Sequence, residues 1–444
     1  MKLWDKGIVT DRQAVEFTTG NDSKLDLMLA RFDVIGSLAH TEMLKEIGLL
    51  APAEHSSLKG ELLGILKKID RGSFFIEEGV EDIHSQVEKE LTDALGTAGK
   101  KVHAGRSRND QVALDIKMFV RSGIERTSGK INTLFRLLID LSDKNKSKLI
   151  PGFTHTQEAM PSSWGLLLGS YAESLTEDMM LFDSAFRISN LSPLGSGAGY
   201  GSSFPLKREM TAKLMGFAGV NYNSINAQES RCKTLLAASF AISSAATTLV
   251  RMATDMCLFM NRSFGYVSFP EELTTGSSIM PHKKNPDVFE IIRGKCNQLK
   301  SLPNECMLLS GNLISGYHRD LQLIKENMLP AFEKLDSCIE MSVKMLRNAE
   351  FKQGIKNDER FSPIFSVEEV NKLVMKGVPF RDAYIKVAEK IRKGEFRPVM
   401  DISHTHEGST GNLCNSEIRE RMDKIMKGFP FDDINSAIIS LLKK

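Results

Sequence analysis

The sequence is poor in cysteine, tryptophan and net charge, and these shortages exclude several classes of protein. Its 444 residues include six cysteines and two tryptophans. The cysteines are scattered, with no C-x-x-C pair and no cysteine and histidine cluster at zinc-ligand spacing, so we expect free thiols in the cytosol. With 58 basic and 56 acidic residues, the formal net charge of +2 provides no overall field for nucleic acid or an anionic membrane.

Membrane-directing segments are also scarce. Residues 1–11 alternate charged and apolar side chains and lack the apolar stretch of a signal peptide, which favours a cytoplasmic protein. Residues 234–250 carry no charge, but they fall short of the roughly 20 apolar residues of a membrane span and include several hydroxyl groups. A helix that is apolar all round needs neighbours on every side, so we expect this one within the helix bundle of an oligomer.

Sustained alternation of apolar and polar residues, the pattern of a half-buried strand, is rare in this chain. Apolar residues recur instead at helical spacing, as over residues 80–95. The same period runs through residues 58–69, 112–141, 164–188, 288–309 and 321–346. The pattern predicts an all-α protein, in which residues 74–76, between two nearby glycines, are the best candidate for a short strand.

The length of the chain sets an expectation for its domains. At about 150 residues per domain, 444 residues correspond to roughly three domains. Boundaries near residues 106 and 356 are predicted because the long helical region lies between them. The predicted units are an N-terminal helical domain of residues 1–106, a central helix-bundle domain of residues 107–356 and a small C-terminal helical domain of residues 357–444.

Four stretches rich in glycine, proline and small polar residues separate the helices, and we expect the chemistry there: residues 103–110, 151–160, 192–205 and 274–286. The glycine-rich residues 192–201 follow a helix rather than a strand, so a dinucleotide-binding motif is rejected. A tight turn where backbone approaches a ligand or a neighbouring subunit is the better interpretation.

The segment of residues 276–286 lacks the GK[ST] ending of a phosphate-binding loop. It combines two serines, two lysines and an asparagine, which favours a mobile cationic loop that closes over a polyanionic substrate. Taken alone, the same composition also fits a linker.

Two of the loops carry candidate binding and catalytic residues. Arg106, Arg108 and Asn109 lie in a turn that enters a helix, where guanidinium groups and first-turn amides can bind a carboxylate. The alternative interpretation is a helix N-cap with solvated arginines. His155 lies between two threonines, and it becomes a candidate acid or base if a carboxylate contacts its second ring nitrogen; otherwise it is structural or solvated.

Together these stretches resemble the fumarase/aspartase superfamily. Residues 276–285 match its hallmark loop G-S-S-x-M-P-x-K-x-N, and residues 103–111, 151–157 and 317–322 resemble the argininosuccinate lyase family within it. The resemblance spans nearly the whole chain. It implies an almost entirely helical, three-domain subunit whose central helices form a twenty-helix core in a homotetramer, with active sites that draw on three subunits.

The resemblance implies a β-elimination that splits argininosuccinate into arginine and fumarate. Removing a proton next to a carboxylate builds a doubly charged aci-carboxylate, so the site needs a base with cations or donors nearby. By resemblance, Ser277 handles the carbon proton, aided by Lys283, and His155 serves the leaving nitrogen with Glu290 behind it. The roles of the serine and the histidine could be exchanged. Neither a cofactor nor a metal is implied, because the neighbouring carboxylate accepts the charge.

The same resemblance implies a set of substrate-binding residues. Arg108, Asn109, Thr154 and Asn285 are expected to bind the succinyl carboxylates and the negative charge that develops on them. Tyr317, Gln322 and Lys325 are expected to bind the arginine portion.

The sequence departs from the family pattern in several places. Residues 3–7 differ from the usual N-terminal motif of the family. In the family an N-terminal hydroxyl group contacts the substrate, and no residue among 18–23 clearly corresponds to it. Tyr200, His282 and residues 226–231 differ as well. A histidine at the position of His282 also occurs in adenylosuccinate lyases, so a lyase acting on a nucleotide adduct is one rival. A silent crystallin-like protein is another, which the presence of all the implied catalytic residues argues against.

Overall fold

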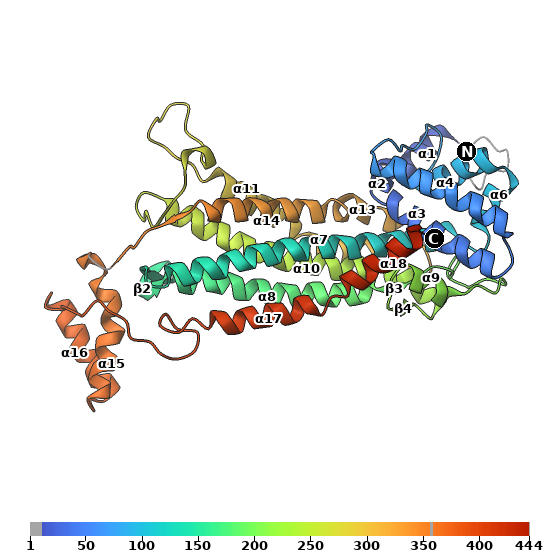
Figure 1. The fold of residues 1–444 in the computed structure, drawn as a ribbon. Coiled ribbons are helices and arrows are strands. Elements are labelled where there is room, and N and C mark those ends of the chain that lie inside the picture. Colours follow the sequence, from blue (N-terminus) through green and yellow to red (C-terminus); the bar gives the residue numbers. More distant parts are fainter. Residues whose placement is uncertain (1–10, 356–357, 444) are drawn as a thin grey trace.

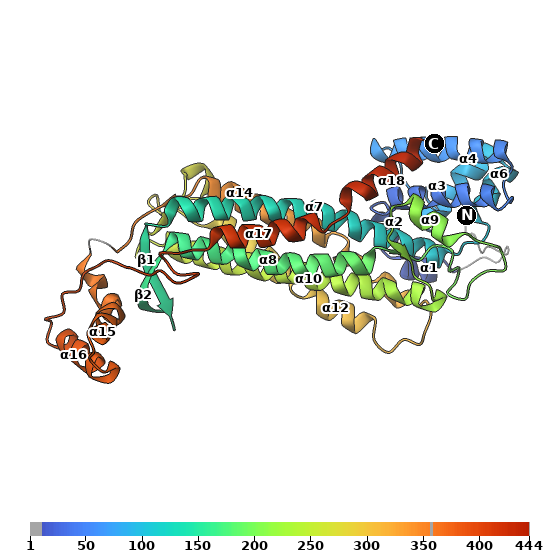
Figure 2. The ribbon, with the colours of Figure 1, turned by 60° about the horizontal axis from the view of Figure 1, so that its bottom comes forward.

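The structure is a computed structural model that describes residues 11–355 and 358–443. Figures 1 and 2 show an elongated molecule with a cluster of short helices at one end, a long helix bundle, and a pair of helices that projects from the other end. The predicted mostly helical fold is confirmed. The unusual opening at residues 3–7 lies outside the described residues.

The N-terminal helices form a cluster with its own core, which includes Leu38, Leu62 and Leu91. Its helices are α1 (Arg12–Thr19), α2 (Asp22–Asp26), α3 (Ala30–Glu46), α4 (Pro52–Asp70), α5 (Ile83–Leu95) and α6 (Thr97–Lys100), followed by the 3₁₀ helix η1 (Lys101–His103). The helical period over residues 58–69 and 80–95 therefore predicted α4 and α5 correctly.

Three long helices, α7 (Arg108–Asn145), α8 (Trp164–Ser189) and α10 (Ser224–Met260), run side by side through the bundle (Figure 1). Phe135, Phe182 and Ile242 are buried where they meet. The uncharged residues 234–250 lie within α10, the one helix of the described chain that is long and apolar enough to cross a membrane. Half of its most apolar window is buried inside the subunit.

Proline divides two of the predicted helical stretches. Residues 288–309 form α11 (Asp287–Leu299) and α12 (Leu302–Leu309), with Pro303 in the first turn of α12. Residues 321–346 belong to the 3₁₀ helix η3 (Arg319–Gln322), α13 (Ile324–Met328) and α14 (Ala331–Arg347), with Pro330 as the N-cap of α14. Proline has no N–H group, so it suits the first turn of a helix and interrupts the hydrogen bonds of its interior.

The strands differ from the sequence prediction. The predicted strand at residues 74–76 is wrong: these residues form neither helix nor strand, and Phe74 is buried in the N-terminal core while Phe75 is exposed. An unpredicted antiparallel hairpin instead joins β1 (Leu149–Thr154) to β2 (Gln157–Ser163). The shorter strands pair as β3 (Leu191–Ser192) with β4 (Gly219–Val220) and β5 (Val267–Ser268) with β6 (Glu350–Phe351).

The C-terminal segment divides into two parts (Figure 2). After the 3₁₀ helix η4 (Glu359–Phe365), α15 (Ser366–Met375) and α16 (Phe380–Arg392) form the projecting pair, with a small core of their own. The chain then returns along the bundle as α17 (Asn415–Lys427), which packs on α7 and α8, and ends in α18 (Phe431–Lys443) against α3 and α9 (Arg208–Leu214). The boundaries near residues 106 and 356 remain predictions.

The glycine-rich turn of residues 192–201 packs against the start of α7. The buried carboxylate of Asp110 accepts hydrogen bonds from the backbone N–H groups of Gly195 (2.9 Å) and Gly197 (3.0 Å). Both glycines have positive φ, at 81° and 60°, which favours residues without a side chain. The backbone thus approaches a carboxylate of its own subunit, and this contact fixes the entry of α7.

Candidate active site

A cavity of about 500 Å³ lies at the N-terminal end of α7, between the N-terminal helices and the bundle. It is lined by α2, the segment before α5, the first turn of α7, Arg231 of α10 and residues 317–325. Five of the residues expected to bind substrate line it: Arg108, Asn109, Tyr317, Gln322 and Lys325. We call this group the cavity cluster.

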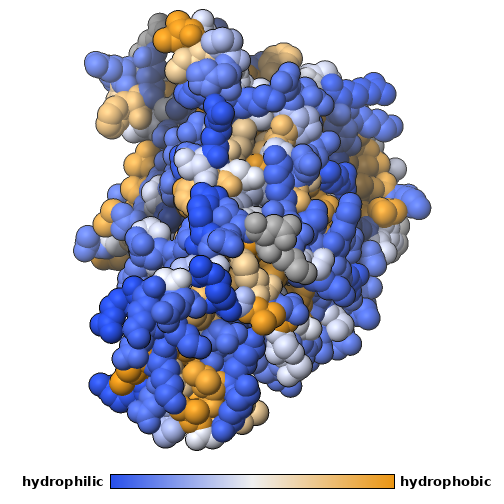
Figure 3. Space-filling model, turned by 90° about the vertical axis from the view of Figure 1, so that its left-hand side faces the viewer, coloured by the Kyte–Doolittle hydropathy of each residue, from blue (hydrophilic) through white to orange (hydrophobic). Residues whose placement is uncertain are grey.

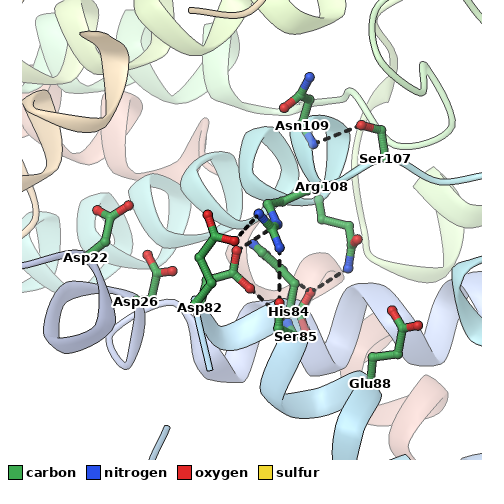
Figure 4. A network of polar contacts seen from close by, with 12 residues as sticks. Asp22, Asp26, Asp82, His84, Ser85, Glu88, Ser107, Arg108 and Asn109 are labelled. Atoms are coloured by element: carbon green, nitrogen blue, oxygen red, sulfur yellow. Dashed lines mark hydrogen bonds and ion pairs between the residues drawn. The ribbon is translucent and has the colours of Figure 1, made fainter. Parts of the chain in front are cut away.

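Arg108 reaches the cavity because Ser107 caps α7. The Ser107 hydroxyl accepts from the backbone N–H of Asn109 (3.2 Å), and this N-cap starts the helix where Arg108 faces α5. The Arg108 guanidinium pairs with Asp82 at 2.7 Å (Figure 4) and with Glu81 at 3.2 Å. The N-cap is thus present, but Arg108 is paired and only partly exposed rather than solvated.

Arg106 and His103 lie on the same wall. The Arg106 guanidinium donates to Ser37 (2.9 Å), and its Nε is buried with no hydrogen-bond partner among the described residues. Burial and the neighbouring Arg106 lower the pKa of His103 to about 4, so this histidine is neutral at physiological pH. The wall therefore presents guanidinium groups, as a carboxylate-binding surface requires.

Lys325 closes the inner end of the cavity. Its Nζ lies 2.6 Å from a carboxylate oxygen of Asp22 and 2.8 Å from one of Asp26, and it is almost fully buried. Burial alone would lower the pKa of Lys325, but the two aspartates raise it above its usual value. Gln322 donates to the carbonyl groups of Thr18 and Thr19 and so anchors α1 beside it.

A buried histidine lies next to the cavity wall. His84 Nδ1 is 2.8 Å from Asp33, and its Nε2 is 3.8 Å from Asp115. Burial would lower the pKa of His84, but these carboxylates raise it to about 9. Its neighbour Ser85 accepts a hydrogen bond from Arg108 (3.1 Å), which links α5 to the first turn of α7 (Figure 4).

The remaining predicted site residues lie at the other end of the bundle. His155 and Thr156 form the tip of the β1–β2 hairpin, with left-handed φ values of 54° and 61°, and both are exposed. Thr154 precedes them and is exposed as well. The imidazole of His155 therefore points away from its own subunit, and no other described part of that subunit covers it.

The loop of residues 276–284 lies at the same end. It is closed by Asn285, whose backbone N–H donates to the Thr275 carbonyl (2.8 Å) and whose amide donates to the Gly276 carbonyl (3.1 Å). The hydroxyl oxygen of Ser277 accepts from the backbone N–H groups of Ile279 (3.4 Å) and Met280 (3.2 Å). Two amides aimed at one oxygen favour negative charge on it.

A second cavity of about 800 Å³ adjoins this loop. Lys283, Asn285 and Glu290 line it, and Glu290 lies 3.9 Å from Arg293 one turn along α11. Within the described residues of one chain, no hydrogen bond or ion pair joins Glu290 to His155. We call Thr154, His155, Ser277, Lys283, Asn285 and Glu290 the bundle-end cluster.

The two clusters are far apart in one subunit. The cavity cluster lies at the first turn of α7, and the hairpin follows its last turn. The 38 residues of α7 rise about 57 Å at 1.5 Å per residue. Figures 1 and 2 accordingly show the N-terminal helices and the β1–β2 hairpin at opposite ends of the helix bundle. The predicted substrate-binding residues therefore do not all converge within one chain, because Thr154 and Asn285 lie with the catalytic candidates.

Several residues of the cavity were not predicted as site residues. These are Asp22, Asp26, Glu81, Asp82 and Arg231. The sequence carried a partial signal for two of them, because Asp22 lies in the window 18–23 and Arg231 in the window 226–231, both of which depart from the family pattern.

Comparisons with known proteins show which family the chain belongs to. A lyase family profile matches residues 7–300. Argininosuccinate lyases of Parabacteroides distasonis and Bacteroides fragilis are each 51% identical, covering 98% and 99% of both chains, respectively, and that of Thermotoga neapolitana is 35% identical over 88% of this chain and 98% of its own.

Among solved structures, similarity shows the fold alone. An EDDS lyase variant with bound fumarate superposes with a TM-score of 0.74 at 19% identity, covering 98% of this chain and 94% of the other. A class II fumarase from Schistosoma mansoni gives 0.67 at 15% identity, covering 94% and 95%. The matched family profile and the full-length relatives together show that this chain is a lyase and belongs to the argininosuccinate lyase family of the fumarase/aspartase superfamily.

Proposed function

We propose that the protein catalyses the reversible cleavage of argininosuccinate into L-arginine and fumarate, a step of arginine biosynthesis. The observation that carries this proposal is the 51% identity, over 98% of both chains, to a protein named argininosuccinate lyase. Relatives named in this way do not favour an adenylosuccinate lyase or a silent crystallin-like protein. The cytoplasm, where such a biosynthetic enzyme would meet its substrate, is the proposed location.

The bundle-end cluster supplies the chemistry in this proposal. Ser277 removes the proton from the succinyl carbon, the electron pair forms the new carbon–carbon double bond, and the carbon–nitrogen bond breaks. The amides of Ile279 and Met280 support negative charge on the serine oxygen, and Lys283 adds a cation when the loop closes. His155, with Glu290 behind it, gives a proton to the leaving nitrogen, and the roles of serine and histidine remain exchangeable.

The cavity cluster holds the substrate in this proposal. Arg108 and Asn109 bind the succinyl carboxylates, together with Thr154 and Asn285 of other subunits, because guanidinium and amide donors match carboxylate geometry. Tyr317, Gln322 and Lys325 hold the arginine portion. No cofactor is required, since the carboxylate next to the reacting carbon accepts the charge.

The working form in this proposal is a homotetramer with shared active sites. The separation of the two clusters supports it, because a substrate that fits a 500 Å³ cavity cannot reach both ends of α7. Exposed apolar side chains on α8 and α10 offer surface for a shared core: Met180, Leu181, Ile188, Phe240 and Leu258.

The projecting helices offer a second surface for subunit contacts. Figure 3 looks at the end of the molecule from which α15 and α16 project, and it shows hydrophobic patches on a largely hydrophilic face. On α15 and α16, Met375, Phe380 and Tyr384 are each more than half exposed.

An ultraviolet assay for fumarate tests the proposed function. We expect fumarate to form from argininosuccinate and not from adenylosuccinate. Fumarate release from adenylosuccinate alone would show that the enzyme is an adenylosuccinate lyase. Release from neither substrate would reject both activities.

A further inference from the structure

Two buried cysteines, Cys296 of α11 and Cys338 of α14, meet where these helices pack together in the bundle (Figure 1). Both belong to the hydrophobic core of the bundle, and they are 0% and 1% exposed. A hydrogen bond joins the two thiols, which are not linked by a disulfide. The fold therefore pairs two thiols that lie far apart in the sequence.

The two thiols of this pair differ in acidity. The hydrogen bond from Cys296 and the ammonium groups of Lys295 and Lys334 lower the pKa of the Cys338 thiol, against the effect of burial. The same hydrogen bond and burial raise the pKa of Cys296. Because the thiolate is the reactive form of cysteine, Cys338 is the nucleophile of the pair and Cys296 is the thiol next to it.

A cavity of about 250 Å³ between α11 and α14 gives small molecules access to Cys338. Cys338 and Lys295 line it, together with apolar side chains that include Ile291 and Met341. Ile291 is 59% exposed, so the cavity lies at the surface of the subunit. A water molecule takes up about 30 Å³ in the liquid, so the cavity has room for a molecule such as hydrogen peroxide beside the sulfur atom.

We propose that Cys338 and Cys296 form a peroxide-reactive pair, in which hydrogen peroxide oxidises Cys338 and the product condenses with Cys296 to a disulfide between α14 and α11. First, the Cys338 thiolate attacks one peroxide oxygen and the O–O bond breaks, which gives a sulfenic acid and hydroxide. The Cys296 sulfur then attacks the Cys338 sulfur and the S–O bond breaks. The thiol proton of Cys296 leaves with the hydroxyl group as water, so peroxide is reduced and two thiols are oxidised.

Peptide mass spectrometry of the intact, assembled protein tests this proposal. The protein is treated with hydrogen peroxide, unfolded in the presence of an alkylating reagent and digested with trypsin, which releases residues 296–300 and 335–344 as separate peptides. We expect the two peptides to be joined, with a mass two hydrogen atoms below their sum. Two of the six cysteines should lose alkylation, and dithiothreitol should restore it. On a non-reducing gel the chain should migrate as a monomer, because the bond forms within one subunit.

Two variants separate the roles of the two cysteines. Cys296→Ala should stop the reaction at the sulfenic acid of Cys338, which dimedone labels, whereas Cys338→Ala should leave Cys296 reduced. Cys306→Ala is the matched control, because Cys306 is also buried, at 2% exposed, and burial raises its pKa to about 11. This control should form the disulfide as the wild-type protein does.

Full alkylation of Cys296 and Cys338 in the wild-type protein, under peroxide conditions that oxidise glutathione in a parallel sample, would overturn the proposal. A disulfide that links two subunits or a different pair of cysteines would do the same. If an alanine variant does not fold, the cross-link in the wild-type protein decides. The readout is a covalent bond and requires no fumarate formation, so its failure is distinct from failure of the proposed function.

Discussion

At the scale of single residues, Ser277 has the most demanding role, because an ordinary serine hydroxyl is a weak base. We predict that Ser277→Ala lowers kcat by about 10²- to 10⁴-fold, the range for a positioned proton-transfer group. KM should change little, since the side chains that hold the carboxylates remain. Steady-state fumarate formation measures both constants.

His155→Asn provides the comparison for this variant. It should also slow cleavage, but it need not stop exchange of the carbon proton with deuterated solvent, which mass spectrometry detects. Near-normal turnover by Ser277→Ala would refute the assignment, and Ser278 would become the next candidate on the loop.

His84 gives the fold a pH dependence of defined sign. The neighbouring Asp33 and Asp115 outweigh burial and raise its pKa from 6.5 to about 9. A pKa that is higher in the folded state stabilises the fold fully below about pH 6.5, and this stabilisation is lost as the pH rises through about 9. The raised pKa of the buried Asp115 acts in the same direction.

We therefore predict that the free energy of unfolding of the wild-type protein falls by up to about 3 kcal/mol between about pH 6.5 and about 9. His84→Gln should show a smaller decrease. Denaturant titrations across this range measure it, and a wild-type stability that rises with pH would contradict the protonated state of His84.

The residue scale also shows how far the sequence predicts the site. Arg108 and Asn109 could be assigned to the start of a helix because capping and first-turn donors involve neighbours in sequence. The contact between Asp26 and Lys325 joins residues 299 positions apart, and no local pattern indicates such a pair. Asp22 became interpretable only once the fold had placed it beside Lys325.

At the scale of elements, helices were predictable and strands were not. The long helices α7, α8 and α10 repeat apolar residues over many turns. The β1–β2 hairpin is buried only near its base, and it turns at His155 and Thr156, whose positive φ values carry no glycine signal. Conversely, the sequence predicted a strand at Phe74. A segment outside any sheet can bury one aromatic side chain and expose the next, as Phe74 and Phe75 do.

The glycine-rich turn provides the test at this scale. Gly195 has φ of 81°, and an added Cβ would lie 2.9 Å from the Cγ of Arg208. We predict that Gly195→Ala destabilises the fold by about 1–3 kcal/mol, from backbone strain and this close contact. Gly60→Ala is the control: it lies in α4, its Cβ would meet nothing within 4 Å, and it should stabilise by about 0.5–1 kcal/mol. Equal denaturation midpoints for the two variants would contradict the role of the turn.

At the scale of the whole molecule, the separation of the two clusters is the dominant feature. Sequence motifs indicate which residues belong to a site, but they carry no information on which subunit supplies each one. Only the length of α7 shows that the cavity cluster and the bundle-end cluster cannot meet within one chain. The account therefore depends on an active site shared between copies of this chain.

Mixing two inactive variants tests this claim most directly. Lys325→Ala removes a residue of the cavity cluster, and Ser277→Ala one of the bundle-end cluster. If each site takes its clusters from different subunits, dissociating and reassembling the two variants together leaves about a quarter of the sites intact in a 1:1 mixture. Fumarate formation should recover to about that fraction of the wild-type rate. A mixture of Ser277→Ala with Lys283→Ala, which alter the same loop, should stay inactive. No recovery in the first mixture, or equal recovery in both, would contradict a site shared between subunits.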